Sequence, residues 1–480
     1  MTTQHRPFEG RRYHFSGVGG SGMAPLALLA ASLGASVTGS DRNRDRGVSL
    51  PIFDHLARGG VRLVPQDGGG VHAGLDAVVY STAVERSNPD MQAAAGAGVP
   101  LVRRGTFLAS VAASRRTIAV AGTSGKSTVT AMIAHILWAT GYDPSFLGGG
   151  PAAALPGTIP PGSLRLGGSD WFVAETDESD GSVAEFAPAV AVLTNLSRDH
   201  KEVEETARNF ERLLAGTSEA AVLHVADPPL ATVAIPPSLR LLRVASEDAA
   251  VWTPADLVAR DIALDPRGVS FRLDVVPVRV PFPGRLTVEN ALLAVAGATA
   301  AGVPLADAAR AVETFGGVRR RLERVGAARG VDVFDDFAHN PVKIGAALEA
   351  LRPEGRLWVC YQPHGYGPTR FFAEALVETF RRALRPGDRL LFSPIYDAGG
   401  TADRSIRSDD LVARLEALGV GASVAPTRAA AAQTVAGGVR AGDRVVSMGA
   451  RDDTLPDFAR ALLDAIAAWT PEAATRPEPR

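Results

Sequence analysis

The sequence has little of what marks a secreted protein or a strongly charged one. Among its 480 residues there is a single cysteine, Cys360, so no internal disulfide can form, which is typical of a reducing compartment. The formal net charge is only −2, so no overall basic field draws the chain onto nucleic acid. We therefore expect no nucleic-acid partner.

Long apolar runs are also missing. Residues 15–40 carry no charge, but glycines and serines interrupt them, and the apolar part PLALLAASLGASV is shorter than the roughly 20 residues that a membrane span needs. The start, MTTQHRPFEG, lacks the apolar stretch of a signal peptide. We therefore expect a cytoplasmic protein with no membrane partner.

What is present is typical of a large α/β protein. Hydrophobic residues make up 46% and charged residues 21%, as in ordinary globular chains. Short apolar runs such as YHFSGV, TIAVAGT and RLWVCYQ alternate with longer helical patterns, which predicts mainly parallel sheets. The proline- and glycine-rich residues 151–163 are predicted to be a loop.

The length predicts about three domains. We expect an N-terminal Rossmann-like domain over residues 1–112 and a central domain over 113–325. The central domain is expected to resemble P-loop ATPases, with a mainly parallel sheet. A second Rossmann-like domain is expected over 326–480.

The first glycine-rich loop lies between a predicted strand and a predicted helix. It contains Gly17, Gly19, Gly20 and Gly22, and Asp41 ends the next strand. Such glycines let backbone N–H groups approach a diphosphate at the helix N-terminus, while the carboxylate can bind a ribose hydroxyl. The pattern predicts a nucleotide-diphosphate site, although a purely structural tight turn is the alternative.

The second glycine-rich loop, VAGTSGKST, lies between another strand and helix. The P-loop pattern asks for glycine where this chain has Val120, so the loop is shortened. Its amides can still converge on phosphate oxygens, Lys126 can place a charge between terminal phosphates, and the Ser127 hydroxyl can bind Mg²⁺. The loop therefore predicts a phosphate-binding site, with a plain glycine turn as the alternative.

Polar clusters follow two later strands. The acidic run that begins at Glu175 ends the strand WFVA, and TNLSRDH, with Asp199 and His200, ends another. Open α/β sheets bind ligands at the carboxyl ends of their strands, and Mg²⁺ prefers carboxylate oxygens. We expect a metal–nucleotide site at this edge.

The motifs GTSGKST, VAETDESDGS, NLSRDH and MGARDD together resemble those of the Mur ligases, the ATP-dependent amide-forming enzymes of peptidoglycan synthesis. The similarity covers nearly the whole chain and includes the shortened loop with Val120. It implies that the N-terminal domain binds a UDP-muramyl substrate, the central domain binds ATP with Mg²⁺, and the C-terminal domain brings an amino acid or peptide. The motifs VAETDESDGS, NLSRDH and MGARDD, together with residues 14–41, are similar to those of the branch that adds L-alanine to UDP-N-acetylmuramate and of the related branch that recycles murein tripeptide.

The resemblance also implies roles for individual residues. The implied catalytic residues are Lys126, Glu175 and His200, and the implied metal ligands are Ser127, Glu175 and His200. The implied nucleotide-binding residues are Gly122, Thr123, Ser124, Gly125, Lys126, Ser127, Thr128, Asn290, Arg320, Asp336 and His339. The implied substrate-binding residues are Gly17, Gly19, Gly20, Gly22, Asp41, Ser81, Thr82, His364 and Arg370.

Two stretches depart from the family pattern. Leu286 and Thr287 replace a His-Asn pair, and the stretch QPHGYGPT lacks two arginines of QPHRYTRT, for which Arg370 is the candidate replacement. The stretch DDFAHNP is more similar to other branches of the family. The identity of the acceptor is therefore the least constrained expectation.

The expected reaction is phosphorylation of a carboxylate by ATP, followed by attack of an amine on the acyl phosphate. Three alternatives stay open: recycling of murein peptides or use of another carboxylate, a nucleotide-binding protein without activity, and a dehydrogenase. The last alternative leaves GKST without a role. The sequence favours neither a monomer nor a homodimer.

Overall fold

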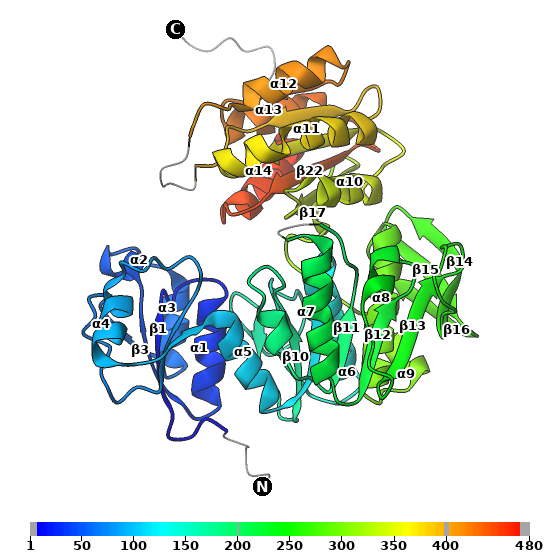
Figure 1. Cartoon of the computed structure of the whole chain (residues 1–480). Helices are drawn as coiled ribbons and strands as arrows, with labels where there is room; N and C mark the ends of the chain where they lie inside the picture. The colour runs from blue at the N-terminus through cyan, green and yellow to red at the C-terminus, as the bar shows by residue number, and fades with distance from the viewer. Residues whose placement is uncertain (1–6, 199–200, 398–402, 471–480) are drawn as a thin grey trace. The chain divides into compact units, whose positions relative to one another are not determined.

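The computed structural model describes residues 7–198, 201–397 and 403–470. These residues form three separate sheets of five, eleven and six strands (Figure 1). By their internal contacts they make two compact units. The first contains the described residues up to Ile262 together with Ser270–Val280 and Val288–Gly317, and the second contains Ala263–Val269, Pro281–Thr287 and the chain from Val318 onward.

The N-terminal sheet is entirely parallel, in the order β3-β2-β1-β4-β5. Its strands are β1 (Arg12–Ser16), β2 (Ser36–Ser40), β3 (Arg62–Val64), β4 (Ala77–Tyr80) and β5 (Leu101–Arg103). Its helices are α1 (Met23–Ser32), α2 (Arg42–Asp45), α3 (Pro51–Arg58), α4 (Pro89–Ala97) and α5 (Arg104–Ala113). Residues Met23 to Ala30 of α1 are all buried, because this uncharged helix lies in the core that the sheet shares with its covering helices.

The central sheet has the order β16-β15-β14-β13-β12-β11-β6-β10-β7-β9-β8. Its central strands are parallel, whereas β7, β9 and β8 pair antiparallel. The strands are β6 (Arg116–Ala121), β7 (Ser145–Leu147), β8 (Thr158–Ile159), β9 (Leu164–Arg165), β10 (Trp171–Glu175), β11 (Val190–Leu193), β12 (Ala220–His224), β13 (Arg240–Ser246), β14 (Leu257–Asp265), β15 (Gly268–Leu273) and β16 (Val276–Val280). The helices are α6 (Lys126–Ala139), α7 (Val203–Gly216), α8 (Arg285–Ala300) and α9 (Leu305–Val312), with short 3₁₀ helices η1 (Ser182–Glu185) and η2 (Pro228–Thr232).

The middle of the central sheet is apolar on both faces. Every residue of β11 is buried, as are the last five residues of β6, so neither strand alternates between polar and apolar side chains. Such continuous apolar strands are typical of parallel sheets covered by helices on both faces. The sheet therefore holds the carboxyl ends of β6, β10 and β11 in a fixed arrangement.

The C-terminal sheet has the order β17-β18-β22-β19-β20-β21, and only the edge strand β17 is antiparallel. Its strands are β17 (Glu323–Ala328), β18 (Val331–Asp336), β19 (Leu357–Gln362), β20 (Arg389–Phe392), β21 (Ala422–Val424) and β22 (Arg444–Gly449). Its helices are α10 (Pro341–Ala350), α11 (Tyr366–Ala383), α12 (Ser408–Ala417), α13 (Arg428–Gly438) and α14 (Leu455–Ala468). One core packs α10, α11 and α12 against the sheet, and a second core packs α13 and α14.

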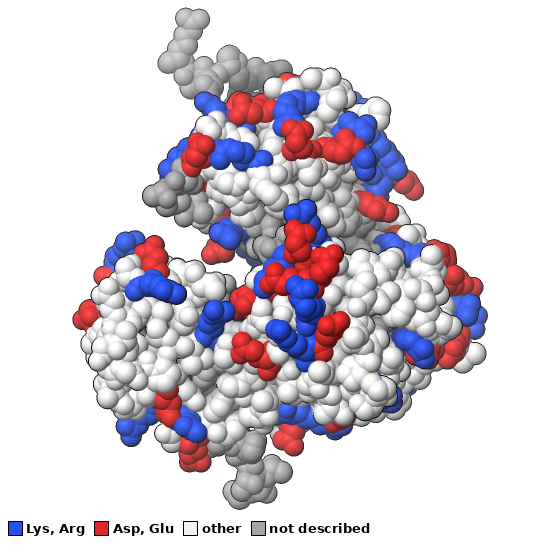
Figure 2. Space-filling view, in the orientation of Figure 1, with Lys and Arg blue, Asp and Glu red and all other residues white. Residues whose placement is uncertain are grey.

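The α/β class and the three-sheet architecture expected from the sequence are confirmed. The stretch 151–163 is not wholly a loop, because it contains the two-residue strand β8, which pairs with β9. In the described part of the chain, no helix has the length and apolar character of a membrane span. The face in view carries both charge signs (Figure 2). The ion pairs Arg198–Glu202 and Lys201–Glu205 lie at the start of α7.

Candidate functional site

The second glycine-rich loop connects β6 to α6 and has a backbone that only glycine fits at two positions. Gly122 has φ +140°, and a Cβ atom there would lie 1.9 Å from Thr194 Oγ1. Gly125 has φ +79°, and its Cβ would lie 2.6 Å from Asn290 Oδ1. With no side chain at either position, the loop can form directly before the N-terminus of the 14-residue helix α6, where the helix dipole favours phosphate.

Val120 lies two residues before Gly122, inside β6, and is fully buried. Its carbonyl oxygen accepts hydrogen bonds from the amide and the hydroxyl of Thr176, each 3.0 Å long. At this position the chain is still a strand, so it does not need glycine. This explains how the shortened loop forms.

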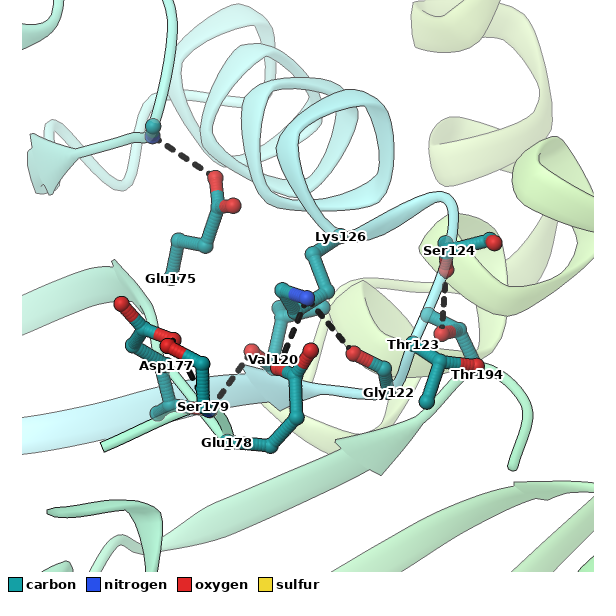
Figure 3. A network of polar contacts seen from close by, with 12 residues as sticks. Val120, Gly122, Thr123, Ser124, Lys126, Glu175, Asp177, Glu178, Ser179 and Thr194 are labelled. Carbon is teal, nitrogen blue, oxygen red and sulfur yellow. Dashed lines mark hydrogen bonds and ion pairs between the residues drawn. The ribbon is translucent and has the colours of Figure 1, made fainter. Parts of the chain in front are cut away.

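Lys126, the first residue of α6, reaches back over its own loop (Figure 3). Its Nζ donates to the carbonyl oxygen of Gly122 over 2.7 Å and forms an ion pair with Glu178 Oε2, also 2.7 Å. The Glu178 side chain is only 7% exposed, so the ammonium group is its counter-ion in a poorly solvated place. The lysine charge is therefore held next to the loop.

Ser127 and Glu175 are brought together at the same edge. The Ser127 hydroxyl donates to Glu175 Oε1 over 3.1 Å, and Glu175 Oε2 accepts from the Gly149 amide over 2.7 Å. An alcohol and a carboxylate side by side are hard oxygen donors of the kind that Mg²⁺ prefers, so this donor set fits the metal. The third expected ligand, His200, lies outside the described residues, and within them no cluster of three or more His, Cys, Asp or Glu side chains could hold a metal.

The end of β11 forms the other wall of the loop, and its role was not predicted. Because Leu193 is paired with Ala121 of β6, the next residues of the two chains run side by side. Asn195 Oδ1 accepts from the Thr123 hydroxyl over 2.7 Å and from the Ser124 amide over 2.9 Å, and the Thr194 hydroxyl donates to the Ser124 carbonyl. Asn195 and Thr194 stand at the start of TNLSRDH, so their position after a buried strand was the available signal.

Glu178 and Asp177 were also missed as separate groups within the acidic run. Burial of the Asp177 carboxyl acts to raise its pKa, but the Ser179 hydroxyl and amide and the charges of Arg104 and Lys126 outweigh it, so the pKa is lowered. Arg104 Nη2 lies 3.1 Å from Asp177 Oδ2 and comes from α5, next to the N-terminal sheet.

Thr128, in the first turn of α6, is half-buried.

The first glycine-rich loop lies between β1 and α1 and is closed by its own acidic residue. Gly17 has φ +74°, and a Cβ on Gly19 would lie 2.8 Å from the Phe53 ring and 2.9 Å from Asp41 Oδ2. Asp41 Oδ2 accepts from the Gly19 amide over 2.9 Å, while Oδ1 caps α2 by accepting from Asn43. Asp41, which was expected to bind a ribose hydroxyl, thus also fixes the backbone of the loop, and it is 7% exposed.

The remaining expected residues of the N-terminal sheet surround that loop. Gly22 precedes α1, and a Cβ there would lie 3.1 Å from the guanidinium of Arg104. Gly20 has more room, because the nearest atom to its Cβ, the Gly17 carbonyl oxygen, lies 3.4 Å away. Ser81 and Thr82 directly follow β4, the neighbour of β1 in the sheet, and Thr82 is exposed.

Arg320 and Asp336, in the second unit, have partners within the C-terminal sheet. Arg320 has φ +58°, its Nε donates to Asp335 Oδ2 over 3.2 Å and its Nη2 donates to the Gly449 carbonyl over 2.7 Å. The Asp336 carboxylate accepts from the amides of Leu322 and Ala338, both over 2.7 Å, and burial raises its pKa. Both side chains therefore fix residues 320–322, the segment just before β17, against β18 and the end of β22.

His339 and His364 lie in contact, with ring centroids 5.0 Å apart at an interplanar angle of 79°. Burial lowers the pKa of His339 to about 4, and burial followed by the charge of Arg451 lowers the pKa of His364. Both imidazoles are therefore favoured in the neutral form. Arg370, on α11, is exposed and pairs with Asp403, and its Nη2 also donates to Ser405 Oγ.

The central sheet thus places a glycine-rich loop, a lysine, a serine and a carboxylate at one edge. This arrangement is typical of P-loop nucleotide-binding α/β proteins. Three family models match successive parts of the chain: "Mur ligase family, catalytic domain" over residues 12–116, "Mur ligase middle domain" over 120–298, and "Mur ligase, glutamate ligase domain" over 320–451. The chain belongs to the Mur ligase family, which is a family of ATP-dependent ligases.

Individual relatives cover almost the entire chain. The UDP-N-acetylmuramate–L-alanine ligase of Mycobacterium marinum is 34% identical, with 96% of this chain and 97% of the relative aligned. That of Acidithiobacillus ferrooxidans is also 34% identical, over 92% and 95%. Among solved structures, the UDP-N-acetylmuramate–alanine ligase of Thermotoga maritima matches with TM-score 0.74 and 23% identity over 94% of this chain and 98% of that one. A murein peptide ligase of Psychrobacter arcticus matches with TM-score 0.63 and 24% identity, over 96% and 100%.

Proposed function

We propose that this protein is the ligase that uses ATP to join the carboxylate of UDP-N-acetylmuramate to L-alanine in peptidoglycan synthesis. One observation carries the proposal: Lys126, Ser127 and Glu175 meet at a glycine-rich loop in a chain that aligns with alanine-adding relatives over 96% of its length. The relatives' names supply the two substrates, and the loop supplies the ATP-dependent chemistry.

The central loop, residues 122–128, is proposed to hold the phosphates of ATP. Its amides and the positive end of α6 face the phosphate oxygens, and Lys126 leaves Glu178 or shares its charge when a phosphate arrives. Ser127 and Glu175 would hold Mg²⁺, with His200 as a third ligand, and the bound ion would neutralise charge on the phosphates. Asn290, which lies against Gly125, is proposed to contact the adenine.

The first loop is proposed to bind the diphosphate of the UDP-linked substrate. The loop directly precedes the N-terminus of α1, and Asp41, Ser81 and Thr82 follow β2 and β4, the two neighbours of β1 in the sheet. This site contains no lysine within the loop, so it is suited to binding a diphosphate and not to transferring a phosphoryl group.

The proposed reaction has two balanced steps. A carboxylate oxygen of the substrate attacks the γ-phosphorus of ATP, which forms an acyl phosphate and releases ADP. The neutral amine then attacks the acyl carbon, the C–O bond to phosphate breaks, and the nitrogen loses a proton. Lys126 stabilises the charge on the transferring group electrostatically, and no covalent bond to the protein is needed.

The C-terminal sheet is proposed to bring the amino acid, with His364 and Arg370 as contacts. Arg320, Asp336 and His339 are proposed to complete the nucleotide site. We also propose domain boundaries near residues 112 and 325 that act as hinges, since an acyl phosphate must be protected from water. Identical small-angle scattering with and without substrate and an ATP analogue would contradict such closure.

The protein is further proposed to act in the cytoplasm as a monomer or homodimer. Size-exclusion chromatography with light scattering distinguishes these two states. A mass above that of the dimer contradicts both.

Phosphate release with UDP-N-acetylmuramate and a panel of amino acids and peptides tests the function. We expect release to depend on both substrates and to be fastest with L-alanine. ¹⁸O in the substrate carboxylate should appear in the released phosphate. A preference for a murein tripeptide would instead indicate a recycling ligase, and ATP binding without acceptor-dependent release would indicate a protein without ligase activity.

A further inference from the structure

Three neighbouring parallel strands of the C-terminal sheet end level with one another. In the pairing of β18, β22 and β19, Met448 is opposite Asp336 on one side and opposite Tyr361 on the other. Three residues after each of these positions the chain has His339 beyond β18, Arg451 beyond β22 and His364 beyond β19. The carboxyl ends of parallel strands form the ligand-binding edge of an α/β sheet, so these side chains are placed where a ligand of this unit binds.

Arg451 has a backbone conformation that an arginine does not favour. Its φ is +62°, in the left-handed region where a side chain costs about 1–2 kcal/mol compared with glycine. The following residue, Asp452, is buried and held by Thr454 and Arg428, which fixes the turn. Strained residues of this kind gather at functional sites, because the surrounding structure enforces a geometry that has a use.

The guanidinium of Arg451 is exposed and has no hydrogen bond or ion pair among the described residues. Three other arginines of this unit have acidic partners: Arg320 pairs with Asp335, Arg370 with Asp403 and Arg428 with Asp452. Arg321 lies over the Phe337 ring. Arg451 does lie near His364, because its charge contributes to lowering the pKa of that imidazole, after burial. It is therefore a cation positioned at the strand edge and open to a ligand.

A second source of positive potential lies at the same edge. The 18-residue helix α11 begins at Tyr366, two residues after His364, and its first turn contains no acidic side chain. Gly365 precedes the helix with φ +71° and leaves this N-terminus without a side-chain cap. A carboxylate near His364 would thus meet a helix N-terminus and a free guanidinium that can bind both of its oxygens.

We propose that Arg451 binds the carboxylate of the incoming amino acid and so restricts the acceptor to amino acids with a free α-carboxylate. The inference rests on the proposed ligase function. Arg451 also places a positive charge next to His364 in the segment QPHGYGPT, which has glycine at position 365 and proline at position 368. The rings of His339 and His364 are favoured in the neutral form, so among these three side chains Arg451 carries the full positive charge.

The test is a comparison of acceptors in the Arg451→Gly variant of the full-length protein. We expect the KM for L-alanine to rise roughly 10- to 100-fold, the effect of losing a charge-assisted hydrogen-bonded pair. The KM values for ATP and UDP-N-acetylmuramate should not change. L-alaninamide, which has no carboxylate, should be a poor acceptor for the wild-type protein and should lose nothing further in the variant. Arg451→Lys, which keeps the charge without the fork, should fall between the two.

Arg329→Gly is the matched control. Arg329 also has a positive φ, +52°, but it lies in the turn between β17 and β18, at the opposite end of β18 from His339. Both glycine variants should fold, although Arg329→Gly also loses the hydrogen bond from Arg329 Nη1 to the Ala436 carbonyl oxygen, and only Arg451→Gly should change the KM for L-alanine. An unchanged KM in a folded Arg451→Gly protein overturns the inference, as does a rise in the KM for ATP.

Hydroxylamine separates this inference from the ligase function itself. It traps an acyl phosphate as a hydroxamate and carries no carboxylate, so Arg451→Gly should form hydroxamate from UDP-N-acetylmuramate and ATP at the wild-type rate. If the wild-type protein forms no hydroxamate, the proposed function fails. If both proteins form it and alanine use is unimpaired, only the role of Arg451 fails.

Discussion

The two glycine-rich loops of the first unit share one framework and differ in what surrounds it. Each loop joins a buried parallel strand to the N-terminus of a buried helix, and each needs glycine because of a positive φ or a close neighbour. At the first loop a carboxylate, Asp41, accepts a hydrogen bond from a loop amide. At the second loop the carboxylates instead face Lys126 and Ser127.

This difference separates binding from chemistry. Backbone amides and a helix N-terminus provide fixed partial charges that can hold a phosphate. Transfer of a phosphoryl group also needs full positive charge at the oxygens where negative charge develops. The second loop has a lysine and a donor set that fits a metal, whereas the first loop has neither. The same strand–loop–helix unit can therefore bind a substrate in one sheet and activate it in the next.

The largest expected effect is that of Lys126→Ala. Loss of one positioned charge at a transferring phosphoryl group typically costs about 3–4 kcal/mol, so kcat should fall roughly 10²- to 10³-fold. Acceptor-dependent ADP formation measures this. Wild-type turnover in the variant would show that the second loop is not the site of chemistry.

Lys126→Ala also leaves Glu178 buried without its counter-ion, which can destabilise the fold. The double variant Lys126→Ala/Glu178→Gln removes that charge. We expect it to recover the wild-type melting temperature and to stay inactive, which separates loss of chemistry from loss of folding.

Glycine substitutions test the division of labour between the loops. Gly122→Ala places a methyl group 1.9 Å from Thr194 Oγ1, and Gly19→Ala places one 2.8 Å from Phe53. We expect the first to raise the KM for ATP and the second to raise the KM for the UDP-linked substrate, each by roughly tenfold or more, since each strains one loop only. Gly20→Ala is the matched control, because the nearest atom to the new methyl group would be the Gly17 carbonyl oxygen at 3.4 Å. It should change the KM of neither substrate by much. Similar effects of Gly122→Ala and Gly19→Ala on both substrates would break the comparison.

A lower pH should decrease the stability of the folded protein through His224, in the central sheet. His224 ends β12, is 7% exposed, and burial lowers its pKa from 6.5 to about 4. The unfolded chain therefore binds a proton on His224 between these pH values while the folded protein does not. The contribution of neutral His224 to the free energy of unfolding should be fully present above pH 6.5. It should decrease by up to about 3 kcal/mol as the pH falls to about 4.

Urea unfolding at several pH values measures that slope. His224→Gln should flatten it because an amide does not titrate in this range, whereas His72→Gln, an exchange at an exposed histidine of the N-terminal sheet, should leave it unchanged. An identical slope in His224→Gln and the wild type would contradict the assignment.

The smallest expected effect is that of Asn290→Ala. Its Oδ1 lies 2.6 Å from the place that a Cβ on Gly125 would take, and its amide is proposed to contact the adenine. Loss of that one neutral hydrogen bond, about 1 kcal/mol, should raise the KM for ATP roughly fivefold. The KM for the UDP-linked substrate should stay at the wild-type value. A change confined to that second substrate would place Asn290 in the wrong site.

Much of the fold could be predicted because its signals are local. The strands β1, β6, β10 and β11 were expected from apolar runs, and the two loops from glycine spacing. The strand β8 was missed because it has only two residues and pairs with β9 across a proline-rich stretch. Asn195 and Thr194 were missed as loop partners because their contacts join positions about 70 residues apart, which no local pattern reveals.

By itself the sequence determined the class of fold, the phosphate-binding chemistry of the second loop and the resemblance to the Mur ligases, because these depend on residue type and short spacing. Only the tertiary structure decided the partners: Glu178 for Lys126, Glu175 for Ser127 and Asn195 for the loop backbone. It likewise placed Arg451 next to His364, which depends on the register of β22 and β19. Pairing between distant strands sets which side chains meet at an edge, and that pairing is fixed by packing of the whole sheet.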